Sequence, residues 1–297
     1  MSGAKERDAM FDSLGREKNK TEDGVLYLVA TPIGNLADLS ERAIKVLSEV
    51  SFIAAEDTRN TAKLLMHIGA SKPMVSYYQH NRTERGEEIC KRLLAGESCA
   101  LVTDAGTPAI SDPGEDLVRL CGEKGIKVTF VPGACAAIAA LALSGLFTGR
   151  FAFEGFISGA RGERKERLTE LSAEKRTLIF YEAPHHLVNT LSDLYEFFGD
   201  RKIALCRELT KLNEEIVRTT LSAAKEYYET NQPRGEYVII VEGKKTEDVF
   251  WRSLTPTEHV EFYINNGMQK NDAIKAAAKD RGVHKSEIYK EILKSDS

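Results

Sequence analysis

The stretch LVTDAGTPAISDPG, residues 101–114, decides the fold of this chain. It begins in a short apolar run, residues 100–102, which is typical of a buried strand. In an open α/β sheet, ligands bind at the carboxyl ends of the strands. A helix start, with Asp112 as cap and Pro113 at the first helical position, accounts for the end of the stretch. It does not account for the carboxylate and hydroxyls of residues 104–111, which favour a ligand-binding loop.

Similar apolar segments alternate with helical patterns on both sides of this stretch. Apolar residues recur at three- and four-residue spacing in residues 39–47, 64–68 and 89–94, as they do on one face of a helix. Strands that alternate with helices predict a parallel, doubly wound α/β sheet. We expect its strands at residues 25–31, 51–55, 73–77, 99–103 and 127–131.

The pattern changes after a helix of small residues, which we expect at residues 134–146. Two clear helices, residues 164–172 and 184–198, separate the strands that follow. Consecutive strands without crossover helices pair antiparallel, so we predict a mixed-sheet α+β domain here. Its expected strands are residues 151–156, 177–182, 202–209, 214–221 and 236–243.

The expected domain organisation has four segments. Residues 1–24 mix charges of both signs and are expected to be a disordered extension. Residues 25–133 form the parallel α/β domain and residues 134–245 the mixed domain. Residues 246–297 are a charged linker and a helix-turn-helix-like tail of three short helices. Because cations and anions balance in the tail, RNA contact and a docking or packing role both stay open.

Composition and charge exclude several classes of protein. A chain of 297 residues, 42% hydrophobic and 29% charged, is an ordinary globular protein with room for substantial cores. Its net charge of −4 means that RNA binding needs a local basic patch. Without a membrane-spanning apolar run or a signal-peptide core, we expect a cytoplasmic protein. The five cysteines and six histidines lack metal-ligand spacing, so we expect buried, reduced thiols and no metal.

Six motifs, in order along the chain, carry a resemblance to a known family. They are LVATPIGNLADLSERA, AAEDTRNTAKLL, VTDAGTPAISDPG, VPGACAA, FYEAPHH and CRELTK, and neither a dinucleotide fingerprint nor a P-loop accompanies them. Together they resemble the tetrapyrrole-methylase-fold methyltransferases, in particular the branch that methylates ribosomal RNA on the ribose 2′-hydroxyl. Two positions depart from the family pattern: Ala134-Cys135, where relatives usually read Pro-Ser, and His186, where relatives usually have Arg.

This resemblance implies a two-domain tetrapyrrole-methylase-like fold with a small C-terminal helical unit, and S-adenosylmethionine in the cleft between the domains. Backbone groups, carboxylates and apolar walls suit such a ligand. For Cys135, Ala136 and Leu209, plain core packing is an equal alternative. The resemblance implies eight cofactor contacts: Pro32, Asp104, Thr107, Cys135, Ala136, Tyr181, Leu209 and Gly235.

A ribose hydroxyl is a poor nucleophile, so a general base should assist the reaction. The carboxylate candidates are Glu56, Asp57, Glu182 and Glu208, while Lys211 serves as base or as partner of the developing oxyanion. For Asp57, capping of a helix N-terminus is an equal alternative. The sequence does not choose among them.

Five cations are candidate ligands of RNA phosphates. Arg59 follows the second strand, where a cation opposes the helix dipole and so fits capping poorly. The other four lie in GARGERKER, residues 159–167, which supplies a local basic arm. A solvated helix start is the alternative for this run. The candidates are Arg59, Arg161, Arg164, Lys165 and Arg167.

The function that the resemblance implies is 2′-O-methylation of a cytidine in the 16S rRNA of the small ribosomal subunit, by a homodimer. One alternative is a methyltransferase of the same fold that acts on a small tetrapyrrole. Another is a non-catalytic RNA-binding or ribosome-assembly protein that has kept the cofactor fold. Cofactor binding separates this last class from the other two.

Overall fold

The computed structural model describes residues 20–245, 251 and 254–295. They form two compact units, one ending at Gly243 and the other beginning at Lys244. Most of the expected N-terminal extension, residues 1–19, and residues 246–248 of the expected linker lie outside the described residues.

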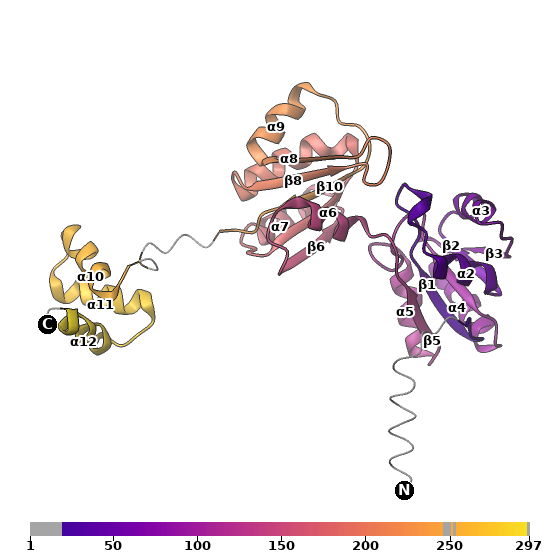
Figure 1. Ribbon diagram of the computed structural model, residues 1–297, viewed down its shortest axis with the longest axis horizontal. Helices are drawn as coiled ribbons and strands as arrows, with labels where there is room; N and C mark the ends of the chain where they lie inside the picture. The colour runs from indigo at the N-terminus through magenta and orange to yellow at the C-terminus, as the bar shows by residue number, and fades with distance from the viewer. Residues whose placement is uncertain (1–19, 246–250, 252–253, 296–297) are drawn as a thin grey trace, which may run out of the picture. The chain divides into compact units, whose positions relative to one another are not determined.

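The first unit begins with a five-stranded parallel sheet, as predicted (Figure 1). Its order is β3-β2-β4-β1-β5. β2 and β4 are buried along their whole length because helices cover both faces of the sheet. The strands are β1 (Val25–Val29), β2 (Phe52–Ala55), β3 (Met74–Ser76), β4 (Cys99–Val102) and β5 (Lys127–Val131).

Two helices cover each face of this sheet, and the sequence explains which side each one buries. α2 (Glu41–Glu49) and α3 (Thr58–His67) pack on one face through Ala43, Val46, Leu47 and Leu65. α4 (Arg82–Leu94) and α5 (Gly114–Glu123) pack on the other through Ile89, Leu93, Leu117 and Cys121. A short 3₁₀ turn, η1 (Leu36–Asp38), precedes α2.

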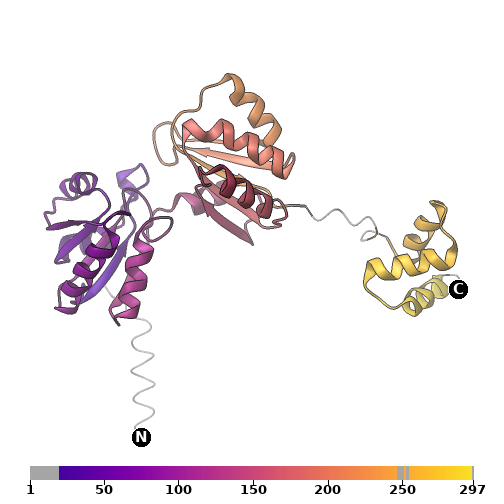
Figure 2. The ribbon, with the colours of Figure 1, turned by 180° about the vertical axis from the view of Figure 1, so that it is seen from behind.

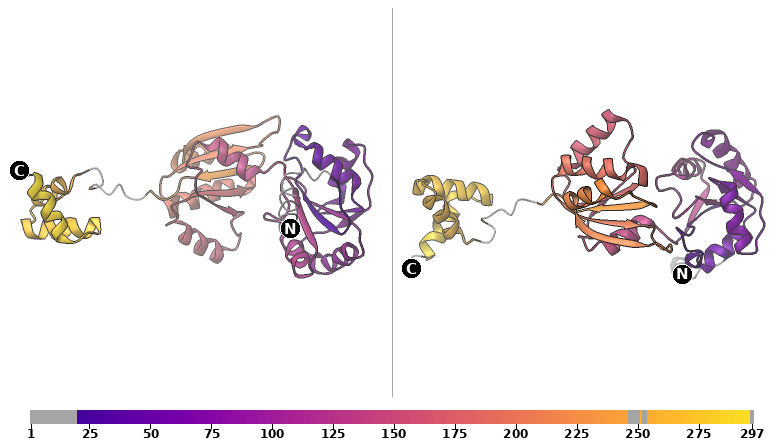
Figure 3. Two further views of the ribbon diagram at one scale, coloured as in Figure 1. Left: turned by 60° about the horizontal axis from the view of Figure 1, so that its bottom comes forward. Right: turned by 90° about the horizontal axis from the view of Figure 1, so that it is seen from above.

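The second sheet of this unit is mixed, which confirms the predicted fold class. Its order is β6-β7-β10-β8-β9; β6 and β7 are parallel, and the other pairs are antiparallel. Figures 2 and 3 show both sheets from other sides. The strands are β6 (Phe151–Gly155), β7 (Thr177–Glu182), β8 (Lys202–Arg207), β9 (Glu215–Thr220) and β10 (Tyr237–Val241).

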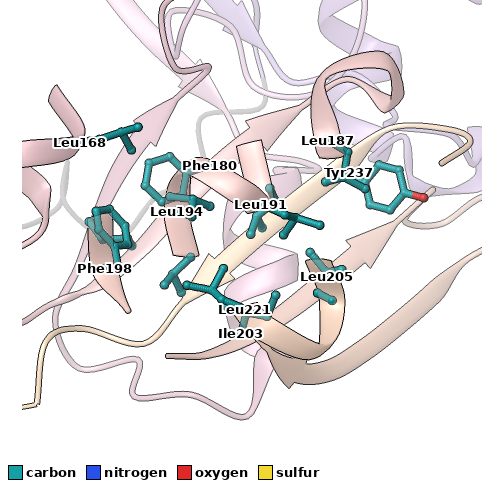
Figure 4. Close-up of a cluster of buried hydrophobic side chains, with 14 of the residues drawn as sticks. Leu168, Phe180, Leu187, Leu191, Leu194, Phe198, Ile203, Leu205, Leu221 and Tyr237 are labelled. Atoms are coloured by element: carbon teal, nitrogen blue, oxygen red, sulfur yellow. The ribbon is translucent and has the colours of Figure 1, made fainter. Parts of the chain in front are cut away.

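Helices again cover both faces of the mixed sheet. α7 (Arg161–Leu171), α8 (Pro184–Phe198) and α9 (Leu221–Thr230) build the larger core over Phe180, Leu205 and Ile239 (Figure 4). The small-residue helix α6 (Ala136–Ser144) packs on the other face, against Ile179, Ala204 and Ile240.

Helix α9 contradicts the prediction that only two clear helices separate the later strands. Thr220 is both the last residue of β9 and the N-cap of α9, whose side chain accepts a hydrogen bond from Ala223 N. Strand and helix therefore meet without a Gly or Pro between them, and the sequence carries no breaker to mark the change. Helix α7 also begins at Arg161, three residues before its predicted start.

The second unit is a three-helix bundle, as the tail pattern predicts. It consists of α10 (Pro256–Asn265), α11 (Lys270–Arg281) and α12 (Lys285–Ser295) around a small core that includes Val260, Ile274 and Ile288. Thr255 and Glu258 form a capping box at its start. Arg281 Nη2 donates to the carbonyls of Trp251 (3.1 Å) and Leu254 (2.6 Å), which ties the entering chain to α11.

The described residues contain neither a membrane-spanning helix nor a cluster of metal ligands. No helix there combines the length and apolar character that crossing a bilayer requires. No cluster of three His, Cys, Asp or Glu side chains in those ranges could hold a metal ion. Four of the five cysteines are buried thiols, and Cys135 is half-buried.

Candidate active site

The loop after β4 is held in a strained shape at the carboxyl edge of the first sheet. Ala109 (φ 66°) and Ser111 (φ 61°) adopt the left-handed region that non-glycine residues rarely occupy. Asp112 supports the loop, because its carboxylate accepts hydrogen bonds from Gly114 N (2.7 Å) and Ile110 N (3.2 Å). Strain of this kind clusters at ligand sites.

Asp112 therefore hydrogen-bonds to the first residue of α5, as expected of a helix cap, but the helix begins one residue later than predicted. Helix α5 begins at Gly114, and Pro113 is its N-cap rather than its first residue. The earlier part of the loop faces a cavity instead. The helix-start interpretation accounts for the end of the stretch, and the ligand-binding interpretation of its earlier part stays a prediction.

A first cavity of about 360 Å³ opens beside this loop. That volume lies in the usual range for small-ligand sites. Its walls come from both sheets of the first unit: the ends of β1, β2, β4 and β7, the start of α6, and the segments around residues 209 and 237. The first cavity is lined by residues 33, 56, 103–107, 110–112, 135, 136, 156, 181–183, 208, 209, 211 and 236–238.

Six of the eight residues expected to contact a cofactor line the first cavity. Thr107 is fixed there by donating to Ala134 O (3.0 Å). Leu209, Cys135 and Ala136 also pack in the core under α6, so core packing and cavity lining are the same surface for them. The six are Asp104, Thr107, Cys135, Ala136, Tyr181 and Leu209.

The other two expected contacts lie outside the first cavity. Pro32 lines a neighbouring second cavity. Gly235 (φ +78°) is a turn residue at which a Cβ would lie 2.5 Å from Glu208 Cγ. Its contribution is the close approach of the backbone to Glu208, which itself lines the first cavity.

Residues 25–225 match the tetrapyrrole (corrin/porphyrin) methylase family. The chain belongs to this family.

The similarity to curated relatives extends over nearly the whole chain. The Ribosomal RNA small subunit methyltransferase I of Halalkalibacterium halodurans is 47% identical over 276 residues, covering 92% of this chain and 96% of the relative. That of Bacillus subtilis is 46% identical over 275 residues, covering 91% and 94%.

Solved structures show the same fold at low sequence identity. Diphthine synthase aligns with a TM-score of 0.57 at 14% identity, over 74% of this chain and 90% of that one. Uroporphyrin-III C-methyltransferase from Thermus thermophilus, complexed with S-adenyl homocysteine, aligns with a TM-score of 0.54 at 19% identity, over 73% and 96%. Methyltransferases of this family use S-adenosylmethionine.

The first cavity of this tetrapyrrole methylase fits that cofactor chemically. The carboxylates of Glu56, Asp104 and Asp112 face it, and they suit a cationic sulfonium or ammonium group. Tyr181 and Phe156, with ring centroids 5.6 Å apart, add aromatic faces that attract a cation. Burial raises the pKa of Tyr181 to about 12, so its hydroxyl stays neutral, and it accepts a hydrogen bond from Ala137 N (3.2 Å).

The candidates for the general base occupy different surroundings. Burial, aided by the charge of Asp104, raises the pKa of Glu56 in the first cavity. Asp57 lies outside that lining and is the N-cap of α3; hydrogen bonds from Arg59 lower its pKa to about 2. Glu182 lines the cavity but accepts hydrogen bonds from Thr190 Oγ1 and Ala183 N (2.9 Å).

Lys211 differs from the carboxylates because it is held as a cation. Its Nζ donates to Glu208 Oε1 (2.9 Å) and Glu236 Oε2 (2.8 Å). Burial alone would lower the pKa of Lys211, but the two carboxylates outweigh it and the pKa is raised. The same contact lowers the pKa of Glu208. Lys211 is therefore a charged donor at neutral pH rather than a base.

The five candidate RNA ligands also separate by their surroundings. Arg59 is exposed but paired bidentately with Asp57. Arg164 is turned inward, donating to Asp193 (2.6 Å) and Thr190 (2.8 Å). Arg167 pairs with Glu154 and Glu170, whereas Arg161 and Lys165 lie exposed on α7.

The structure adds residues to the site that sequence reasoning missed. Ile33, Phe156 and Val238 line the first cavity. Ile33 and Phe156 each follow the carboxyl end of a strand, so the rule that placed Asp104 there would have found them. No local signal marks Val238, which lies inside β10 and reaches the cavity only through the pairing of the second sheet.

Proposed function

We propose that this protein transfers a methyl group from S-adenosylmethionine to the ribose 2′-hydroxyl of a cytidine in the 16S rRNA of the small ribosomal subunit. The cavity at the end of β4, with its carboxylates and aromatic wall, carries the cofactor part of the proposal. The names of the relatives at 46–47% identity support the RNA part. The cytoplasm, where ribosomal subunits are present, is the proposed location.

The residues of the site divide the work in this proposal. The bound cofactor supplies an electrophilic methyl group. Asp104, Tyr181 and Phe156 hold the cofactor in a fixed orientation, and fixed orientation supplies much of the acceleration in a displacement reaction. Lys211 provides a positive charge beside the developing alkoxide. Glu56 takes the hydroxyl proton, because its pKa is raised whereas those of Asp57 and Glu208 are lowered, which makes it the stronger base among these carboxylates.

The proposal is tested by incubating the protein with radiolabelled S-adenosylmethionine and either 30S subunits or free 16S rRNA. We expect label on one cytidine ribose, recovered as an alkali-resistant dinucleotide after hydrolysis. Label on a nucleobase, or transfer to uroporphyrinogen but not to RNA, would replace the proposal by another methyltransferase activity. Absence of cofactor binding in a calorimeter would favour the non-catalytic alternative.

We also propose that the protein acts as a homodimer, and one surface supports this. The outward side of α6 is apolar: Ile138 and Leu143 on the helix, and Phe147 just after it, are exposed. Such a surface usually meets another protein surface. Light scattering at micromolar concentration tests the proposal, and a stable monomer contradicts it.

A further inference from the structure

A second cavity of about 500 Å³ adjoins the first. The loop after β1 and the exposed face of α3 form most of its wall, and neither belongs to the first cavity apart from Ile33. The two cavities share Ile33, Thr103, Asp104, Ala105, Lys211 and Glu236. A side chain of this shared wall can therefore contact a ligand in the first cavity and a ligand in the second.

We propose that the second cavity holds the acceptor nucleotide, with its ribose hydroxyl at the shared wall. This inference rests on the proposed function. The volume suits one small ligand rather than a helical RNA segment. The nucleotide must therefore be turned out of its strand, as enzymes that modify nucleotides require and as sequence-specific RNA recognition commonly achieves.

The walls of the second cavity match the parts of a nucleotide. Pro32, Leu36 and Leu64 offer apolar surface to a base, and Leu36 is 47% exposed. Asn60 lies beside them with an amide that both donates and accepts hydrogen bonds, as the edge of a pyrimidine requires. Lys63, one turn further along α3, is exposed and has no ion-pair partner in the ranges that the structure describes. It provides a cation for a phosphate.

The charges favour a nucleotide over a tetrapyrrole with many carboxylates. Lys211 is already paired with Glu208 and Glu236, so Lys63 is the cation of this lining without an ion-pair partner among the described residues. Asp104 adds a further negative charge at the shared wall. One phosphate is attracted to Lys63 at the rim, whereas several carboxylates would meet Asp104 and Glu236.

The segment that precedes Lys211 of the shared wall has a strained backbone. Glu208 (φ 50°) and Thr210 (φ 66°) are both left-handed, and Thr210 Oγ1 is buried without a hydrogen-bond partner in the described part of the chain. Gly34 lets the β1 loop meet this segment, because a Cβ there would lie 2.3 Å from Lys211 Cγ. A buried hydroxyl without a partner is costly. Such a segment is suited to change its contacts when a ligand arrives.

The test measures binding, so that it does not depend on methyl transfer. A labelled single-stranded RNA of nine nucleotides, with one central cytidine, is titrated into the full chain with S-adenosylhomocysteine present. We expect Lys63→Gln to raise the Kd roughly three- to tenfold and to reduce the salt slope by about 1. Asn60→Ala should reduce the preference for this RNA over one with uridine at that position. Lys91→Gln, an exposed lysine on α4, is the matched control.

A 5-iodocytidine at the central position keeps the cytosine edge and locates the nucleotide by photo-crosslinking. Crosslinks to residues 31–36 or 60–64 support the proposal, and crosslinks confined to other segments overturn it. The proposal is also overturned if Lys63→Gln and Lys91→Gln weaken RNA binding equally, or if neither variant weakens it. If the wild-type protein binds RNA in this cavity but methylates no 16S rRNA, the proposed function fails while the nucleotide site stands.

Discussion

At the scale of single residues, Glu56 combines a cost to folding with a role in the proposed reaction. The pKa of its carboxyl is raised above 4.5 by burial and by Asp104, so the charged form is disfavoured in the folded protein. The free energy of unfolding therefore falls as pH rises from the unfolded pKa through the raised folded pKa. Above the raised folded pKa this cost is fully present.

Glu56→Gln is expected to stabilise the protein and to impair catalysis. Removing the charge should raise Tm, at about 2–4 °C for each kcal/mol relieved. Loss of a general base should lower kcat roughly 100-fold or more. Thermal melts and single-turnover rates at pH 7 measure both effects, with the exposed Glu226→Gln on α9 as control. An unchanged kcat would remove Glu56 from the mechanism.

The wild-type rate should also depend on pH with a definite sign. A base works in its charged form, so kcat should fall as pH drops through the raised pKa of Glu56. The Glu56→Gln variant should lose this limb of the profile. A profile that keeps the limb in the variant assigns it to another group.

Asp104 offers a cleaner separation of binding from stability, because it is exposed on the loop after β4. Asp104→Ala should weaken cofactor binding roughly tenfold, the loss of one charge-assisted contact. The Tm of the cofactor-free protein should stay nearly unchanged. Calorimetric titration with S-adenosylhomocysteine measures the first quantity, and normal affinity would refute the assignment.

The sequence predicted the residues of this site unevenly. Asp104, Thr107 and Tyr181 follow strand ends or lie on a strand next to one, so motif and topology place them together. The inward turn of Arg164 was not predictable, because its partners Asp193 and Thr190 lie on another helix, more than 25 residues away. Pairing across elements depends on packing that no local pattern records.

At the scale of elements, every predicted strand is present, since apolar runs bounded by turn residues identify buried strands well. Helix α9 was missed because β9 passes into it at Thr220. Helix α7 starts earlier than its apolar pattern, because its first turn is polar and its buried residues, Leu168 and Leu171, come in later turns. Helix ends are set by capping and solvation more than by hydrophobic spacing.

Helix α7 allows the basic-arm hypothesis to be tested with an internal control. Replacing the exposed Arg161 and Lys165 with Gln should weaken RNA binding and reduce the salt slope by up to about 2, without changing Tm. Arg164→Gln should instead lower the free energy of unfolding by about 1–3 kcal/mol, because it leaves Asp193 and Thr190 without their donor. Filter binding and urea denaturation separate the two effects. An unchanged salt slope would contradict the basic-arm hypothesis and favour a solvated helix without RNA contacts.

At the scale of the whole molecule, the chain divides where Gly243 meets Lys244. The three-helix unit has its own core and its own tie to the entering chain through Arg281. None of the residues described in this unit lines either cavity. A unit with an independent core can be removed without exposing the core of the other.

Truncation after Gly243 should therefore preserve cofactor affinity and the Tm of the first unit. Under the hypothesis that the tail helps select the ribosomal substrate, methylation of 30S subunits should fall at least tenfold, because binding contacts are lost. The assay compares kcat/KM for the full and truncated chains. Full activity after truncation would show that the first unit recognises the RNA unaided.

The wall of residues 103–105, common to both cavities, has a thermodynamic consequence. The backbone pair between Thr31 and Gly106 joins that wall to the β1 loop, so neither loop can shift alone. Two ligands that press on one wall are energetically linked, and linkage is reciprocal. Whatever factor the cofactor product imposes on RNA affinity, RNA must impose on the affinity for that product. The strength of this coupling between cofactor product and RNA therefore depends on one short segment of backbone.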